Sequence, residues 1–202
     1  MPDQRPNVTL LTKGKDRRQQ IPVAGLAAGA ESDSALLPHS LRPRLAAIAP
    51  SVVEAVRFAG GWLFDQVMAG WDVTVLTAGE ADARPAQILG ARVADLEAIL
   101  ARRVRGSCLQ GIVVRAELYA SDARVRRMVD EARESLAEVR LWGEGWPAEL
   151  DGAAGPVRYQ LSVAARAFKA QALAAAAIPA DPAQNTEEFR RTVRRPNLVL
   201  TR

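Results

Sequence analysis

The sequence contains very little cysteine and histidine. Its 202 residues include one cysteine, Cys108, and one histidine, His39. A single cysteine cannot form a disulfide within the chain, and one histidine is too few for a zinc site built from cysteine and histidine. Any metal chemistry would have to rest on carboxylates alone, and we expect neither a bound metal nor a cofactor.

Long apolar segments are also missing. No stretch of about 18 consecutive apolar residues occurs, and the N-terminus lacks the charged, apolar and small-residue pattern of a secretory leader. The sequence is nevertheless 49% hydrophobic and 25% charged, which is typical of a globular domain with a sizeable core. We therefore expect a cytoplasmic protein without a membrane span.

The common catalytic and nucleotide-binding motifs are absent as well. No G-x-x-x-x-G-K-[ST] phosphate loop occurs, and Gly143-Glu144-Gly145 is followed by a tryptophan and a proline where a dinucleotide loop needs open backbone N–H groups. Ser107 lacks the G-x-S-x-G elbow, and we interpret His39 as an ordinary loop residue. We assign no catalytic residues from the sequence.

What the sequence does contain is one structural unit that occurs twice. Residues 71–77 and 111–115 are short, β-branched runs, which predict buried strands. Each run is followed by an Asp-Ala-Arg tripeptide, at Asp82 and at Asp122, and then by apolar residues at helical spacing. This spacing predicts a helix of about four to five turns after Asp82 and a second helix from Ser121. Residues 139–142 are expected to form a third strand.

The repeated unit predicts an α/β fold. We expect a Rossmann-like or RecA-like domain of two or three layers, with a small, mostly parallel sheet and flanking helices. Parallel strands end at one edge of the sheet, where ligands bind in such folds, so both tripeptides are expected there. The candidate ligand-binding residues at this edge are Asp82, Arg84, Tyr119, Asp122, Arg124 and Trp146. The alternative is that Asp82 and Asp122 only cap helices, which by itself explains the repetition.

The flanking segments are less regular. Apolar residues keep a helical period over 45–68 across Gly60-Gly61, which predicts one helix with a kink or a close backbone contact at the glycines. A second, alanine-rich helix with a basic edge that includes its lysine is predicted over 159–177. A short last helix is expected to start at 186–188, and the apolar tail 198–200 is interpreted as an edge strand or a docking segment.

Positive charge is concentrated at the two ends of the chain. The net charge is +4, but residues 1–45 hold seven Lys/Arg against four Asp/Glu, and residues 186–202 hold five against two. We therefore divide the chain into a basic N-terminal segment (1–44), an α/β core (45–178) and a basic C-terminal tail (179–202). The residues expected to contact nucleic acid or an acidic protein are Lys13, Lys15, Arg17, Arg18, Arg190, Arg191, Arg194 and Arg195. The alternative is that these residues belong to solvated tails without a ligand.

Several short patterns between residues 60 and 150 carry a resemblance to a known family. The chain contains, in this order, Gly70-Trp71-Asp72-Val73-Thr74-Val75-Leu76, Ile88-Leu89-Gly90-Ala91, Asp122-Ala123-Arg124-Val125-Arg126-Arg127 and Leu141-Trp142-Gly143. This order resembles the ImuA-type RecA-like accessory proteins of actinobacterial mutagenesis, which accompany an inactive Y-family polymerase homologue. The resemblance implies a non-catalytic adaptor in DNA damage tolerance, although the phosphate loop of a RecA core is missing.

The main functional hypothesis is thus a non-catalytic adaptor that binds protein partners or nucleic acid through its basic ends. The alternative is a degenerate Rossmann-like enzyme or ligand-binding domain that acts on a nucleotide or another phosphorylated small molecule at the Asp-Ala-Arg edge. A second alternative is a structural protein that assembles with copies of itself through apolar helix faces. The oligomeric state stays open.

Overall fold

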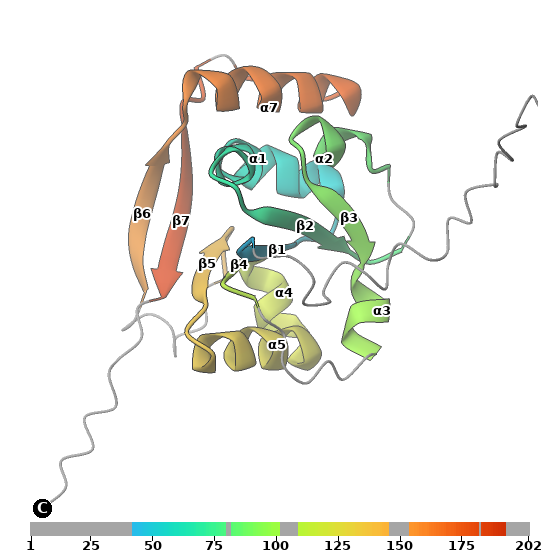
Figure 1. Cartoon of the computed structure of the whole chain (residues 1–202), viewed down its shortest axis with the longest axis vertical. Helices are drawn as coiled ribbons and strands as arrows, with labels where there is room; N and C mark the ends of the chain where they lie inside the picture. The colour runs from blue at the N-terminus through green and yellow to red at the C-terminus, as the bar shows by residue number, and fades with distance from the viewer. Residues whose placement is uncertain (1–41, 80–81, 102–108, 146–153, 182, 193–202) are drawn as a thin grey trace, which may run out of the picture.

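A computed structural model describes residues 42–79, 82–101, 109–145, 154–181 and 183–192. They form one seven-stranded sheet with helices on both of its faces, as Figure 1 shows. The strands are β1 (Arg44–Ile48), β2 (Asp72–Thr77), β3 (Arg92–Asp95), β4 (Gly111–Arg115), β5 (Glu138–Trp142), β6 (Ala154–Gln160) and β7 (Thr186–Thr192). The helices are α1 (Val52–Met68), α2 (Arg84–Ile88), α3 (Leu96–Ala101), α4 (Ala116–Ser121), α5 (Ala123–Glu134) and α7 (Val163–Ala175). The predicted α/β class is confirmed.

The strand order in the sheet is β3-β2-β1-β4-β5-β7-β6. The first five strands in this order run parallel to their neighbours, whereas β7 is antiparallel to both β5 and β6. The chain therefore builds outward from β1 in two directions, first through β2 to β3 and then through β4 to β5. The described sheet also extends past residue 178, because β7 lies between β5 and β6.

The central strand β1 corrects the prediction of a single helix over 45–68. All five of its residues are buried, and it pairs with β2 on one side and β4 on the other. A strand that is buried on both faces carries an almost continuous apolar run, and such a run fits a helix equally well. Helix α1 begins only at Val52, where the Ser51 hydroxyl accepts a hydrogen bond from the Glu54 N–H at 3.2 Å.

The close backbone contact predicted at Gly60-Gly61 is observed within α1. A Cβ atom on Gly61 would lie 2.5 Å from a methyl group of Leu161, so that no larger residue fits without movement. The backbone N–H groups of Gly61 and Trp62 donate to the two carboxylate oxygens of Glu187, each at 2.9 Å. Gly61 thus lets α1 approach both Leu161, which lies between β6 and α7, and Glu187 of β7.

The strands of the repeated unit are confirmed as β2, β4 and β5, but the long helix predicted after Asp82 is wrong. The chain instead forms the short helix α2, the edge strand β3 and the short helix α3. Gly90 ends α2 at a positive φ of 78°, and a Cβ atom there would lie 2.8 Å from Val67. Val93 and its neighbours then pair with β2. The helical spacing therefore arises from three separate elements that bury apolar residues in turn.

The C-terminal helix is also shorter than predicted. Residues up to Gln160 belong to β6, and α7 starts after Ser162, whose hydroxyl accepts from the Ala165 N–H at 2.9 Å. The short helix expected from Thr186 is wrong, because these residues form β7, where Glu187 and Phe189 are buried. Lys169 does not lie on an exposed basic edge, since it is only 4% exposed.

Two apolar clusters fill the space on the two faces of the sheet. Alternate residues of the central strands face opposite sides, so Ala47 and Val113 belong to the cluster under α1 and α7, whereas Ile48 and Val114 belong to the cluster under α5. Figure 1 shows α1 and α7 on one side of the sheet and α4 and α5 on the other. Helices on both faces explain why the central strands β1 and β4 are apolar at nearly every position.

In the part of the chain that the structure describes, none of the helices is long and apolar enough to span a membrane. The cytoplasmic location stays a prediction.

Candidate functional site

The parallel sheet changes its direction of growth between β1 and β4. In open α/β sheets, ligands bind outside the carboxyl ends of the strands at this switch point. Glu54, in the first turn of α1, follows β1, while Arg115 and Glu117 lie at the end of β4 and the start of α4. These three side chains form a charged cluster that we call the switch-point cluster.

Arg115 occupies the middle of the switch-point cluster. Its Nε donates to Glu117 Oε2 at 2.6 Å and its Nη2 to Glu117 Oε1 at 3.1 Å, while Nη1 forms an ion pair with Glu54 Oε1. Burial would raise the pKa of Glu117, but hydrogen bonds from Arg115 and from backbone N–H groups hold it below its ordinary value. Glu54 and Glu117 therefore share one guanidinium, so the cluster holds two acidic groups against one basic group.

The loop after β5 closes the cluster on one side. Gly143 has a positive φ of 92°, and a Cβ atom there would lie 2.9 Å from Glu117 Oε2. The N–H of Glu144 donates to Glu117 Oε1 at 3.3 Å. The glycine is therefore required both by the backbone conformation and by the approach of the Glu117 carboxylate.

An exposed aromatic ring lies next to these charges. Phe58, one turn along α1 from Glu54, is 37% exposed. The guanidinium carbon of Arg115 lies 5.8 Å from the centre of its ring, and that of Arg57 lies 5.5 Å away. The site thus combines an apolar face with hydrogen-bond acceptors and a donor, as small-molecule sites in proteins commonly do.

Two buried polar atoms lie at the carboxyl ends of β2 and β5, which flank the central strands β1 and β4. Thr77 ends β2 and Trp142 ends β5, and both side chains are 1% exposed. Among the described residues, neither Thr77 Oγ1 nor Trp142 Nε1 has a hydrogen-bond partner. Buried polar atoms are normally paired, so these atoms mark the carboxyl ends of the strands as a polar region.

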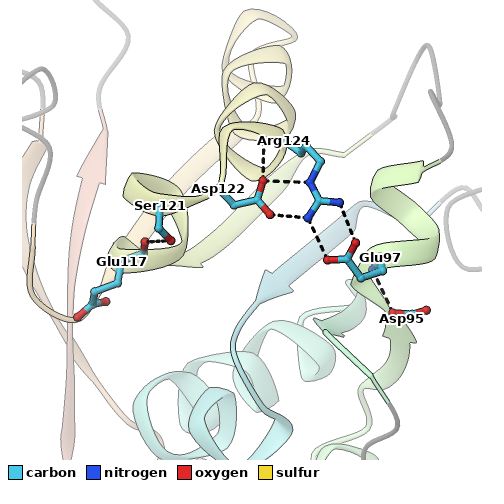
Figure 2. Close-up of polar contacts among 6 residues, drawn as sticks. All are labelled: Asp95, Glu97, Glu117, Ser121, Asp122 and Arg124. Carbon is cyan, nitrogen blue, oxygen red and sulfur yellow. Dashed lines mark hydrogen bonds and ion pairs between the residues drawn. The ribbon is translucent and has the colours of Figure 1, made fainter.

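The predicted residues of the second tripeptide form a separate ion-pair network, shown in Figure 2. Arg124 pairs with Asp122 at 2.8 Å and with Glu97 of α3 at 2.8 Å. Asp122 also caps α5 by accepting from the Arg124 N–H at 2.8 Å. Hydrogen bonds from the side chain and the backbone of Arg124 lower the pKa of Asp122 to about 2, and Asp122 and Glu97 raise that of Arg124. The capping interpretation of Asp122 is thus confirmed.

The first tripeptide is arranged differently. The Asp82 carboxylate accepts a hydrogen bond from the Arg84 N–H at 2.9 Å, but the residue at the N-cap position of α2 is Ala83. Arg84 is exposed at the start of this short helix. Arg124, in contrast, is held by Glu97 and Asp122, so its guanidinium is already neutralised.

The remaining predicted residues lie in other places. Tyr119 is 2% exposed, and its hydroxyl donates to Asp130 at 3.3 Å. Arg190 and Arg191 belong to β7, where Arg191 approaches Glu138 of β5 at 3.4 Å. The residues that lie outside the described part of the chain are Lys13, Lys15, Arg17, Arg18, Trp146, Arg194 and Arg195.

Sequence reasoning missed Glu54, Phe58 and Arg115. The helical period over 45–68 places Glu54 and Phe58 inside one long helix, whereas they occupy the first turns of α1 directly after β1. The signal that could have revealed them is Pro50-Ser51, which can end a strand and cap a helix. Arg115 is recognisable in the sequence as the charged residue that ends an otherwise apolar strand.

The described residues contain no group of three or more His, Cys, Asp or Glu side chains that could hold a metal ion.

Comparison with known proteins finds no matching family model and no matching curated protein. Solved structures do match. A deacetylase triple mutant from the teicoplanin biosynthetic pathway has a TM-score of 0.52 at 15% identity, over 76% of this chain and 99% of that chain. The zinc-inhibited form of teicoplanin deacetylase Orf2 has a TM-score of 0.53 at 13% identity, over the same shares of the two chains. A deacetylase–teicoplanin complex has a TM-score of 0.50 at 15% identity, over 75% of this chain and 99% of that chain.

These comparisons correct two expectations. The resemblance to ImuA-type RecA-like proteins is wrong, because the solved structures named above, which share the fold, are deacetylases. The hypothesis of a non-catalytic adaptor in DNA damage tolerance, which drew on that resemblance, is wrong with it. The short sequence patterns reflect an α/β fold rather than a RecA core, since glycine-bounded apolar strands and capped helices occur in many parallel sheets.

Proposed function

We propose that this protein binds a small, acylated, sugar-like molecule at the switch-point cluster and removes its acyl group. The proposal is supported by the shared fold with deacetylases that act in teicoplanin biosynthesis. The strand order β3-β2-β1-β4-β5 also supports the predicted Rossmann-like subtype, in which ligands bind at this edge. The observation that carries the proposal is the placement of Glu54 and Arg115 at the carboxyl ends of β1 and β4, in contact with each other.

The charges of the site favour a neutral, hydroxyl-rich ligand over a phosphate. Two carboxylates surround one guanidinium, so the switch-point cluster repels an anion. Carboxylates accept hydrogen bonds from hydroxyl groups, and the exposed ring of Phe58 offers an apolar surface to the other face of a sugar. The alternative of an enzyme or ligand-binding domain is therefore retained, but with a sugar-like ligand in place of a phosphorylated one.

In the proposed reaction, the Glu54 carboxylate accepts a proton from a water molecule while the water oxygen bonds to the acyl carbonyl carbon. The Arg115 guanidinium stabilises the negative charge that develops on the carbonyl oxygen. The C–N bond of the amide then breaks, and the proton held by Glu54 passes to the leaving nitrogen. The products are a carboxylic acid and a free amine.

The direct test is release of acetate from N-acetylated amino sugars and their glycosides. We expect Glu54→Gln to lower kcat/KM by about 100-fold or more, because general base catalysis contributes at least that much. Arg115→Lys should lower kcat, since a single ammonium group does not reproduce the forked guanidinium. Glu131→Gln, on the exposed face of α5, is the matched control and should leave turnover unchanged.

Two results would contradict this proposal. Acetate release that persists in Glu54→Gln would place the base elsewhere. Saturable binding of the sugar without acetate release by the wild-type protein would remove the hydrolytic step and leave a ligand-binding domain on a deacetylase fold.

A further inference from the structure

A second candidate site lies away from the switch-point cluster, between α7 and the segment that leads into β7. A pocket of about 230 Å³ opens there, lined by α7 on one side and by residues around Asp181 and Gln184 on the other. None of its lining residues belongs to the switch-point cluster. Its volume is below the range of about 300–1,000 Å³ that is usual for drug-sized ligands, so it suits a smaller molecule.

The helix side of this pocket carries positive charge. Lys169 is 4% exposed and its Nζ lies 2.7 Å from Glu187 Oε1. Glu187 therefore already neutralises the Lys169 ammonium group. Arg166 lines the same side and is exposed at the pocket. Arg166 is the cation on this side that can donate to an anionic group in the pocket.

The Lys169–Glu187 pair is held in the core. The two carboxylate oxygens of Glu187 accept from the Gly61 N–H and the Trp62 N–H at 2.9 Å each, in addition to Lys169. These contacts fix the buried pair against α1. The positive charge that this side of the pocket offers to a ligand therefore belongs to Arg166.

The opposite side of the pocket carries negative charge, because Asp181 lines it. Asp181 Oδ1 accepts from the Ala183 N–H at 2.9 Å, and the Asp181 carbonyl accepts from the Gln184 N–H at 3.1 Å. These hydrogen bonds tie the Asp181 carboxylate to the backbone that follows it. Apolar atoms of Val163 and Leu173 complete the lining. Positive and negative groups thus lie on opposite sides, with an apolar surface between them.

The geometry points to a binding site for a small zwitterion, namely an α-amino acid with an apolar side chain. Its carboxylate binds Arg166, its ammonium group binds Asp181, and its side chain packs on Val163 and Leu173. This assignment uses both charges of the pocket and its apolar surface, and a simple anion would leave the Asp181 carboxylate facing a like charge.

Isothermal titration with three related probes tests this assignment. Leucine carries both charges, N-acetylleucine keeps only the carboxylate, and leucinamide keeps only the ammonium group. We expect leucine to bind at least about tenfold more tightly than either analogue, because each analogue leaves one charged group of the pocket unpaired. No binding of leucine at millimolar concentration would overturn the proposal, and so would equal binding of leucine and N-acetylleucine.

Two exposed positions allow variants that should fold. Asp181→Asn keeps the oxygen that accepts from Ala183 and should abolish the preference for leucine over N-acetylleucine. Arg166→Gln should reduce the preference for leucine over leucinamide. Glu54→Gln should bind leucine like the wild-type protein, so failure of the deacetylase proposal and failure of this one are distinguishable. Loss of leucine binding in Glu54→Gln, or no change in either pocket variant, would place the amino acid elsewhere and overturn the assignment.

Discussion

At the level of single residues, the acidic side chains at the carboxyl edge differ in the contacts that they make. Asp122 accepts from the backbone of α5 and from Arg124, and Glu97 neutralises the rest of that guanidinium. Glu54 and Glu117 share Arg115 in a partly buried position next to an exposed ring. The first group stabilises the ends of helices, whereas the second group retains an excess of negative charge that a ligand can use.

Asp122 gives a prediction at this scale. Its pKa is about 2 in the folded protein, below the ordinary value of 3.8, chiefly because the Arg124 side chain and backbone donate to it. A lowered pKa in the folded state stabilises the protein above pH 3.8, and this contribution is lost as the pH falls toward 2. In urea unfolding, the wild-type protein should exceed Asp122→Asn in stability at neutral pH, and the difference should shrink between pH 4 and pH 2.

The helix cap is separable from the charge in the same experiment. Asn caps helices as well as Asp does, whereas Ala does not, so Asp122→Ala should lower the free energy of unfolding by about 1 kcal/mol more than Asp122→Asn. The charge contribution should be modest, because Arg124 is 50% exposed and its ion pairs are screened by solvent. A difference between wild-type and Asp122→Asn that stays constant from pH 7 to pH 2 would contradict the lowered pKa.

At the level of elements, the two glycines of α1 have different reasons to be there. A Cβ atom on Gly61 would lie 2.5 Å and 2.8 Å from the two methyl carbons of the buried Leu161. A Cβ atom on Gly60 would lie 3.3 Å from Leu89 and Val56, which is tight but can be relieved by a small shift. Only Gly61 is therefore required for the packing of α1 against the segment that precedes α7.

This difference predicts that alanine destabilises the protein at position 61 but not at position 60. Gly61→Ala should lower the free energy of unfolding by about 1–3 kcal/mol through overpacking. Gly60→Ala is the matched control, since it gains about 1 kcal/mol of helix propensity against a mild contact and should remain close to wild-type stability. Urea denaturation measures both. Two results would contradict this explanation. One is a Gly61→Ala variant as stable as Gly60→Ala. The other is a double variant, Gly61→Ala with Leu161→Ala, in which the alanine at position 61 is as destabilising as it is beside Leu161.

At the level of the whole molecule, β7 joins the C-terminal part of the chain to the core that the parallel strands and α1 form. β7 lies between β5 and β6, and its buried side chains Glu187 and Phe189 contact α1. The Phe189 ring lies 5.5 Å from that of Trp62, and α7 packs over α1 on the same face. The C-terminal strands and α7 therefore share one core with the parallel strands, although β7 runs antiparallel to both of its neighbours.

A shared core predicts a single cooperative unfolding transition. Tryptophan fluorescence and far-ultraviolet circular dichroism should give coincident urea transitions. Phe189→Ala should shift both midpoints together by an amount equivalent to about 3–5 kcal/mol, as expected for the loss of a buried ring. Phe168→Ala is the control, because Phe168 is 45% exposed and should have a smaller effect. Two separate transitions, or a shift of only one signal in Phe189→Ala, would show that the C-terminal strands unfold independently.

Short-range features of the sequence determined the fold class and its best-defined elements. The β-branched runs of β2 and β4 lie between turn-forming residues, and Asp122 caps the amphipathic helix that follows. These features depend on residues close in sequence, such as a capping carboxylate and a glycine at positive φ. They were sufficient to predict parallel strands with their carboxyl ends at one edge.

Only the tertiary structure decided the identity of β1, β3 and β7, and with them the candidate site. The central strand β1 is a strand because β2 and β4, which are distant in sequence, supply its hydrogen bonds. β7 is a strand because it completes the ladder between β5 and β6, although its residues are mostly polar. Glu54 and Arg115 are 61 positions apart and meet only because β1, which leads into the helix of Glu54, pairs with β4, which ends at Arg115. Periodicity within one segment cannot encode such pairings, since they depend on which other segments bury its two faces.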